Sequence, residues 1–199
     1  GQSQVLMSRG SFTTLSPFAL VQPVYLVWLG FFLASIGGVL GLAMSLDDGL
    51  RGTWAFALFR PVSRRAYIGI KLIVGVMLTL ALSLLPIVAY SAWAMRPGNV
   101  AGPFRWSLLQ PAVEACGWNI VIFLGAFLSG IRPAKWWWSR LWPLATAVVL
   151  GLWFWLISLE PNFPNSLTPS TAQYWALVVG FTVVLVVSIL DVVEERDFA

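Results

Sequence analysis

Five long apolar stretches, separated by short charged or proline-containing segments, limit the folds open to this chain. A helix of about 20 apolar residues crosses the roughly 30 Å hydrocarbon layer of a membrane. Lipid offers no partners to backbone N–H and C=O groups, so such stretches cross it as helices. We therefore predict an all-α, polytopic membrane helix bundle with five spans, at residues 24–46, 68–95, 106–131, 141–159 and 172–190.

The composition excludes several classes of protein. Charged residues make up 10% of the chain, whereas soluble domains usually contain about 25%. The chain has no histidine and a single cysteine, Cys116, so it can form neither a histidine-ligated metal site nor an intrachain disulfide. It contains no G-x-x-x-x-G-K-[ST] sequence and therefore no P-loop of its own. We expect this chain to be a non-enzyme with no metal, no cofactor and no nucleic-acid partner.

The basic residues are distributed unevenly between the two sides of the predicted bundle. Nine Lys and Arg residues lie on the side reached by the first, third and fifth spans, and three lie on the other. Cytoplasmic loops carry an excess of Lys and Arg. We therefore predict that the side with nine basic residues, which also holds the C-terminus, is cytoplasmic. Residues 1–23 are then an external segment, and residues 24–199 form the transmembrane domain. An external start before an odd number of spans predicts either a removed signal peptide or a further helix upstream, and we favour the helix because residues 1–23 lack a signal-peptide pattern.

The segment between the first two spans, predicted as a loop over residues 47–67, is more than a polar connection. It contains an apolar run at residues 54–59 that favours a short amphipathic helix. Thr53 is a suitable N-cap, Asp48 lies near the positive end of the helix, and Pro61 ends it. Its aromatic side suits either the lipid headgroup region or a groove on a partner protein.

This segment resembles one that follows the second span in permease subunits of type 2 ATP-binding-cassette exporters. In that family an acid, a Gly-Thr pair, an apolar run, a Pro-Val-Ser-Arg sequence and a span-opening Lys occur in this order. The family's acid is commonly Glu, so Asp48 departs from the pattern. The matching residues are Asp48, Gly52, Thr53, residues 54–59, Pro61, Val62, Ser63, Arg64 and Lys71.

The resemblance implies a six-span permease fold, of which the five spans seen here are the second to the sixth. It also implies that the loop forms a coupling helix on a separate ATP-binding-cassette subunit, which binds ATP and Mg²⁺. It further implies that the chain pairs with a second permease half, in a homodimer or a heterodimer. The implied location is the inner (plasma) membrane of a bacterium. The implied coupling contacts are an apolar set, Trp54, Phe56, Leu58 and Phe59, and a basic set, Arg60, Arg64 and Arg65.

Two polar residues of the third span are candidates for the transport path. Glu114 is the only acid well inside a span, where a charge costs about 2.5–3.5 kcal/mol on insertion scales. We interpret it either as a lining of the path or as a structural hydrogen-bonding group. Asn119 is taken as its nearest amide, but a separation of five positions turns the two side chains apart on a helix, so we expect no direct bond.

Three glycines of the first span, Gly37, Gly38 and Gly41, are predicted to permit close helix packing, either within the subunit or at a dimer face. For the whole chain we keep a functional alternative to the exporter subunit. This is a membrane anchor or core subunit of a redox or lipid-modifying enzyme complex, although the chain has no His or Cys pair to hold haem or a cluster. A scaffold that recruits a cytoplasmic protein is a third interpretation.

Overall fold

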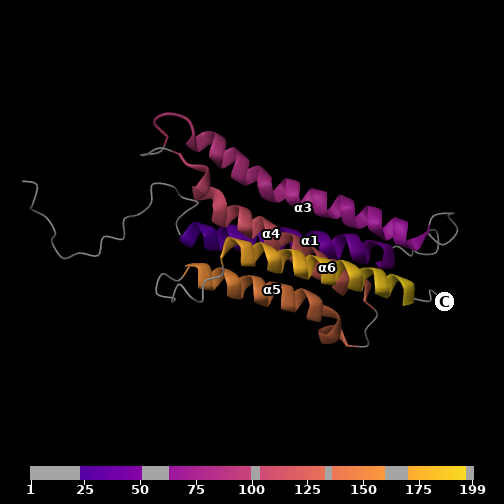
Figure 1. Cartoon of the computed structure of the whole chain (residues 1–199). Helices are drawn as coiled ribbons and strands as arrows, with labels where there is room; N and C mark the ends of the chain where they lie inside the picture. The colour runs from indigo at the N-terminus through magenta and orange to yellow at the C-terminus, as the bar shows by residue number, and fades with distance from the viewer. Residues whose placement is uncertain (1–22, 51–62, 100–103, 133–135, 160–169, 196–199) are drawn as a thin grey trace, which may run out of the picture.

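The computed structural model describes residues 23–50, 63–99, 104–132, 136–159 and 170–195. Over these residues the chain is all-helical and contains no strand (Figure 1). The long helices are α1 (Pro23–Leu50), α3 (Arg64–Ala94), α4 (Gln110–Ile131), α5 (Trp137–Leu159) and α6 (Thr171–Glu195), and a short 3₁₀ helix, Trp106–Leu109, precedes α4.

Four of the five long helices are apolar and long enough to cross a membrane. The qualifying segments are Tyr25–Leu46, Arg65–Ala94, Trp106–Ile131 and Thr171–Glu194. This finding confirms the predicted fold class at the level of an all-α bundle with membrane-compatible helices. The crossing expected at residues 141–159 coincides with α5, a helix of 23 residues, and a crossing by α5 stays a prediction.

The helices extend beyond the spans predicted from hydropathy. Helix α1 continues to Leu50, α3 begins at Arg64, and α6 continues to Glu195. At 1.5 Å per residue, the 28 residues of α1 measure about 42 Å, which exceeds a hydrocarbon layer of about 30 Å. The predicted loop over residues 47–67 therefore includes the last turn of one helix and the first turn of the next.

Helix α4 is the centre of the bundle and contacts each of the other four long helices. Its span is 78% buried, whereas the other three candidate spans are at most 28% buried. In Figure 1, α3 lies along one side of the bundle and α5 along the opposite side. The residues of α4 from Val121 to Ile131 are all buried, and this helix supplies half of the buried hydrophobic residues in the described part of the chain.

Small residues allow α1 to lie close against α4. A Cβ atom at Gly41 would fall 2.7 Å from the Cβ of Ala126, and one at Gly37 would fall 2.9 Å from the carbonyl oxygen of Asn119. Both glycines therefore serve contacts within the subunit. A Cβ atom at Gly38, the third glycine of the predicted set, would meet no atom within 4 Å. Gly38 therefore makes no close contact of this kind.

The turn after α3 is built by a glycine in a left-handed conformation. Helix α3 ends at Ala94, and Gly98 has a φ of 90°, which non-glycine residues seldom adopt. The Asn99 side chain donates a hydrogen bond from Nδ2 to the carbonyl oxygen of Trp93 at 2.8 Å. This bond satisfies a carbonyl group in the last turn of the helix.

Candidate functional site

One end of the bundle gathers the helix ends that flank the basic segments, and we call it the basic end. It comprises the C-terminal ends of α1, α4 and α6 and the N-terminal ends of α3 and α5 (Figure 1). A Cβ atom at Gly130 of α4 would fall 2.5 Å from the Cβ of Ser45 of α1, which places these two ends together.

The basic end carries the described basic residues that the charge count assigned to one side of the membrane. Arg65 and Lys71 lie in the first turns of α3, Arg132 follows α4, and Arg140 lies in the first turn of α5. Arg96 and Arg105 lie at the opposite end, where α3 ends and α4 begins. The fold therefore separates the basic residues spatially in the way that the sequence pattern predicts.

Most of the predicted coupling residues lie outside the described residues. These are Gly52, Thr53, Trp54, Phe56, Leu58, Phe59, Arg60 and Pro61. Asp48 belongs to the last turn of α1, and Arg64 is the first residue of α3. Arg65 and Lys71 are the two members of the set whose side-chain contacts the structure gives.

Lys71 connects the two helices on either side of this segment. Its Nζ donates a hydrogen bond to the carbonyl oxygen of Met44 in α1 at 3.2 Å. The same ammonium group lies 5.2 Å from the centre of the Tyr67 ring, within the range of a cation–π contact. Lys71 is half-buried, so these contacts hold the beginning of α3 against the end of α1.

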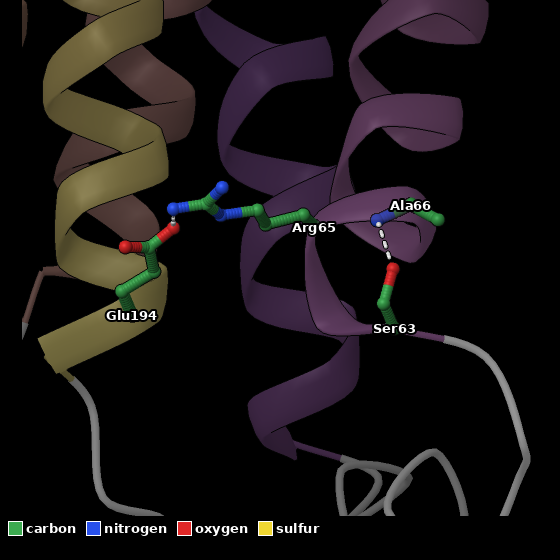
Figure 2. Close-up of polar contacts among 4 residues, drawn as sticks. All are labelled: Ser63, Arg65, Ala66 and Glu194. Carbon is green, nitrogen blue, oxygen red and sulfur yellow. Dashed lines mark hydrogen bonds and ion pairs between the residues drawn. The ribbon is translucent and has the colours of Figure 1, made fainter.

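Arg65 connects α3 to the last turn of α6, as Figure 2 shows. Its guanidinium group forms an ion pair with the carboxylate of Glu194. We predicted Arg65 as a basic contact to a partner, whereas here it is paired within its own chain. The preceding residue of the motif, Ser63, is the N-cap of α3, and its Oγ accepts a hydrogen bond from the backbone N–H of Ala66 at 3.3 Å.

Arg140 caps the C-terminal end of α4. Its Nε donates to the carbonyl oxygen of Ser129 at 3.0 Å, and its Nη2 donates to that of Gly130 at 2.5 Å. Carbonyl groups in the last turn of a helix lack intrahelical partners and favour a nearby positive charge. Arg140 therefore has a structural role, which was not predicted from the sequence.

Glu114 belongs to a polar cluster at the end opposite the basic end. Gln110 Nε2 donates to Glu114 Oε1 at 2.9 Å and to Thr171 Oγ1 at 2.6 Å. The Tyr174 hydroxyl donates to the main-chain carbonyl oxygen of Glu114. The prediction that Asn119 is the nearest amide to Glu114 was wrong, because Gln110 lies one helical turn away on the same face. The spacing of four residues could have identified it.

Asn119 is directed toward α3 instead and is 1% exposed. Its Nδ2 donates a hydrogen bond to Ser83 Oγ at 2.7 Å, and Ser83 Oγ donates to the carbonyl oxygen of Thr79 at 2.7 Å. The two candidate path residues therefore have separate partners, Glu114 toward α6 and Asn119 toward α3. Thr79 and Ser83 were not among the predicted site residues, although their four-residue spacing places them on one helical face.

Comparisons of the chain with protein-family models, with curated proteins and with solved structures give no match. Within the part of the chain that the structure describes, no group of three or more His, Cys, Asp or Glu residues could hold a metal ion. The features that bear on function are thus the basic end, the Glu114 cluster and the buried polar contact of Asn119.

Proposed function

We propose that this chain is the transmembrane permease subunit of an ATP-driven exporter of the type 2 ATP-binding-cassette family. The ATP-binding subunit is a separate chain that contacts residues 52–65. The observation that carries the proposal is the position of this motif: it joins α1 to α3, whose facing ends are connected by the Lys71–Met44 hydrogen bond.

These contacts suggest how a push on the segment would reach the bundle. A displacement of residues 52–65 would act first on the beginning of α3. From there Lys71 would transmit it to α1, and Arg65 would transmit it to α6 through Glu194. Helix α4, which is buried among the others, would serve as the fixed element against which they move. Binding energy from ATP on the partner chain would thus change the relative positions of two permease halves.

The proposal places the basic end in the cytosol, because cytoplasmic segments carry the excess of Lys and Arg. The five long helices would be spans two to six of a six-span fold in a bacterial inner membrane, with the C-terminus cytoplasmic. A fluorescent protein fused to the C-terminus folds only in the cytosol, so it should be fluorescent in intact cells. An alkaline phosphatase fusion that is active at the same position would contradict this orientation.

The coupling role is tested by replacing the aromatic residues of the segment. The double variant Trp54→Asp/Phe59→Asp should lose co-purification with the ATPase while its membrane insertion stays normal. A matched variant with conserved apolarity, Trp54→Phe/Phe59→Leu, should retain it. Normal co-purification and normal ATP turnover in the aspartate variant would overturn the assignment.

The same purification separates the proposal from its alternative. Mass spectrometry of the co-purifying subunits should identify a protein with a Walker A sequence. A cytochrome or a transferase in its place would favour the membrane anchor or core subunit of a redox or lipid-modifying enzyme. A cytoplasmic protein of neither kind would favour the scaffold.

A further inference from the structure

Helix α3 carries its Ser and Thr side chains on its buried side and many large apolar residues on its exposed side. Thr79, Ser83 and Ser91 are three of the six buried polar side chains in the described part of the chain. Gly75 continues the same face one turn before Thr79, and it is also buried. The exposed side chains of this helix include Ile70, Ile73, Val74, Met77, Leu85 and Val88.

The Nδ2 of Asn119 in α4 faces this polar side of α3, whereas its Oδ1 lies on the side of Gly37 in α1. Two hydrogen-bonding atoms are left unused here. Thr79 Oγ1 and Asn119 Oδ1 are buried side-chain atoms with no hydrogen-bond partner among the described residues. A buried polar group without a partner costs about 1–3 kcal/mol. If these polar residues only held the helices together, we would expect each buried donor and acceptor to have a hydrogen-bond partner within the bundle.

The unused atoms lie near the middle of the bundle. Asn119 is 13 residues after Trp106 and 12 before Ile131, the ends of its candidate span. These separations correspond to about 20 Å and about 18 Å along the helix axis. Polar groups at the centre of a membrane are costly and are typically retained for a function.

The residues around the contact define what it could bind. Ser83, Thr79 and Asn119 are neutral and can both donate and accept hydrogen bonds. Apolar residues lie on either side: a Cβ at Gly75 would fall 2.9 Å from Cε2 of Phe123, and Ile87, one turn after Ser83, is buried. Such a surface suits an amphipathic molecule with a neutral hydroxyl or amide group. Glu114 contributes nothing to it, because its partners are Gln110 on its own helix and Tyr174 on α6.

We propose that Thr79, Ser83 and Asn119 form the binding site for the exported molecule, and that the site opens when α3 moves away from α4. The site takes amphipathic molecules with an uncharged hydroxyl- or amide-bearing group. This inference rests on the proposed function, because the ATP-driven displacement of α3 is what exposes the buried contact.

The test measures the reactivity of single cysteines in native membranes with ATP present. The background is Cys116→Ala, and the variants are Thr79→Cys, Ser83→Cys and, as a control on the exposed apolar side of the same helix, Leu85→Cys. A small water-soluble methanethiosulfonate reacts with the thiolate, which forms only where water is accessible. Thr79→Cys and Ser83→Cys should react at least about tenfold faster than Leu85→Cys.

Protection from the reagent tests the chemical class of the ligand. Monoolein, a neutral amphiphile with two hydroxyl groups, should slow the reaction of Ser83→Cys about threefold at twice its dissociation constant. Its anionic counterpart, oleoyl lysophosphatidylglycerol, should not protect at the same concentration. Equal protection by both, or by neither, would overturn the assignment to neutral molecules.

The outcome also separates this site from the proposed function. If the ATPase co-purifies normally but both cysteines react as slowly as Leu85→Cys, the contact is permanent helix packing and the site is overturned. If both cysteines react rapidly and no ATPase co-purifies, a water-accessible site on α3 is supported while the exporter assignment is overturned.

Discussion

The guanidinium group of Arg65 and the carboxylate of Glu194 form an ion pair that joins the first turn of α3 to the last turn of α6 (Figure 2). The two residues are 129 positions apart, and α6 reaches Arg65 only because it continues past the apolar span to Glu195. The segment that resembles a coupling motif is thereby connected to the C-terminal helix as well as to α1.

The Arg65–Glu194 ion pair should contribute little to stability. The two side chains are 67% and 44% exposed, so solvent screens their attraction. A double-mutant cycle with the neutral replacements Arg65→Gln and Glu194→Gln should give a coupling energy of about 0.2–1 kcal/mol that falls as salt is raised. Thermal unfolding of the four proteins in detergent provides the measurement. No coupling at low salt would show that the pair does not form in solution.

Two adjacent glycines of α1 should respond differently to the same substitution. A Cβ at Gly37 would collide with the side chain of Asn119, whereas one at Gly38 would meet nothing within 4 Å. Overpacking of this kind typically costs 1–3 kcal/mol, so Gly37→Ala should lower the unfolding midpoint. Gly38→Ala should leave stability unchanged or raise it by up to about 1 kcal/mol, because Ala has a higher helix propensity than Gly and its Cβ meets no atom there. Equal effects of the two substitutions would contradict the observed rotation of α1 against α4.

Arg140 should be more important for stability than the neighbouring Arg132. Replacing Arg140 with Gln removes the charged donor of two hydrogen bonds to the end of α4, at a cost of about 1.5–3 kcal/mol. Arg140→Lys should recover only part of this loss, because an ammonium group lacks the planar fork of donors. Arg132 is exposed, and Arg132→Gln serves as the control in the same unfolding assay. A neutral effect of Arg140→Gln would exclude the capping role.

Glu114 should tolerate replacement by Gln. The new side chain keeps the oxygen that accepts the hydrogen bond from Gln110, and Tyr174 bonds to the main chain of residue 114. Stability should change by less than about 0.5 kcal/mol, and ATP turnover by the complex with its ATPase should be unchanged. A tenfold loss of ATP turnover, equivalent to about 1.4 kcal/mol, would instead support the interpretation that Glu114 lines the transport path.

Hydropathy was sufficient to predict the long helices, and several of these helices extend beyond the predicted spans. The energetic signal in the sequence is the transfer of apolar side chains into lipid, which stops where charged residues begin. Backbone hydrogen bonding in a helix continues past that point. The helix ends at Leu50, Arg64 and Glu195 therefore lie beyond the predicted spans. Residues 47–50 and 64–67, which were predicted as loop, belong to helices.

The candidate path residues illustrate what a sequence pattern omits. Glu114 and Asn119 are conspicuous in the sequence because polar residues are rare in apolar stretches. Neither of their partners was predicted from the sequence. Gln110 lies four residues before Glu114, and this spacing is visible in the sequence. Ser83 lies 36 residues before Asn119, and no local pattern connects the two. A hydroxyl group in a span is inconspicuous in hydropathy, because it can bond to its own helix.

The amino-acid sequence alone determined that this chain forms long apolar helices, in which order they follow one another, and on which end the basic residues collect. The tertiary structure alone decided how each helix is rotated: that Gly37 faces α4 while Gly38 does not, and that Asn119 meets Ser83. The reason is that helices in lipid are apolar on every side, so hydrophobicity does not orient them. Close packing of small residues and hydrogen bonds between helices do so instead.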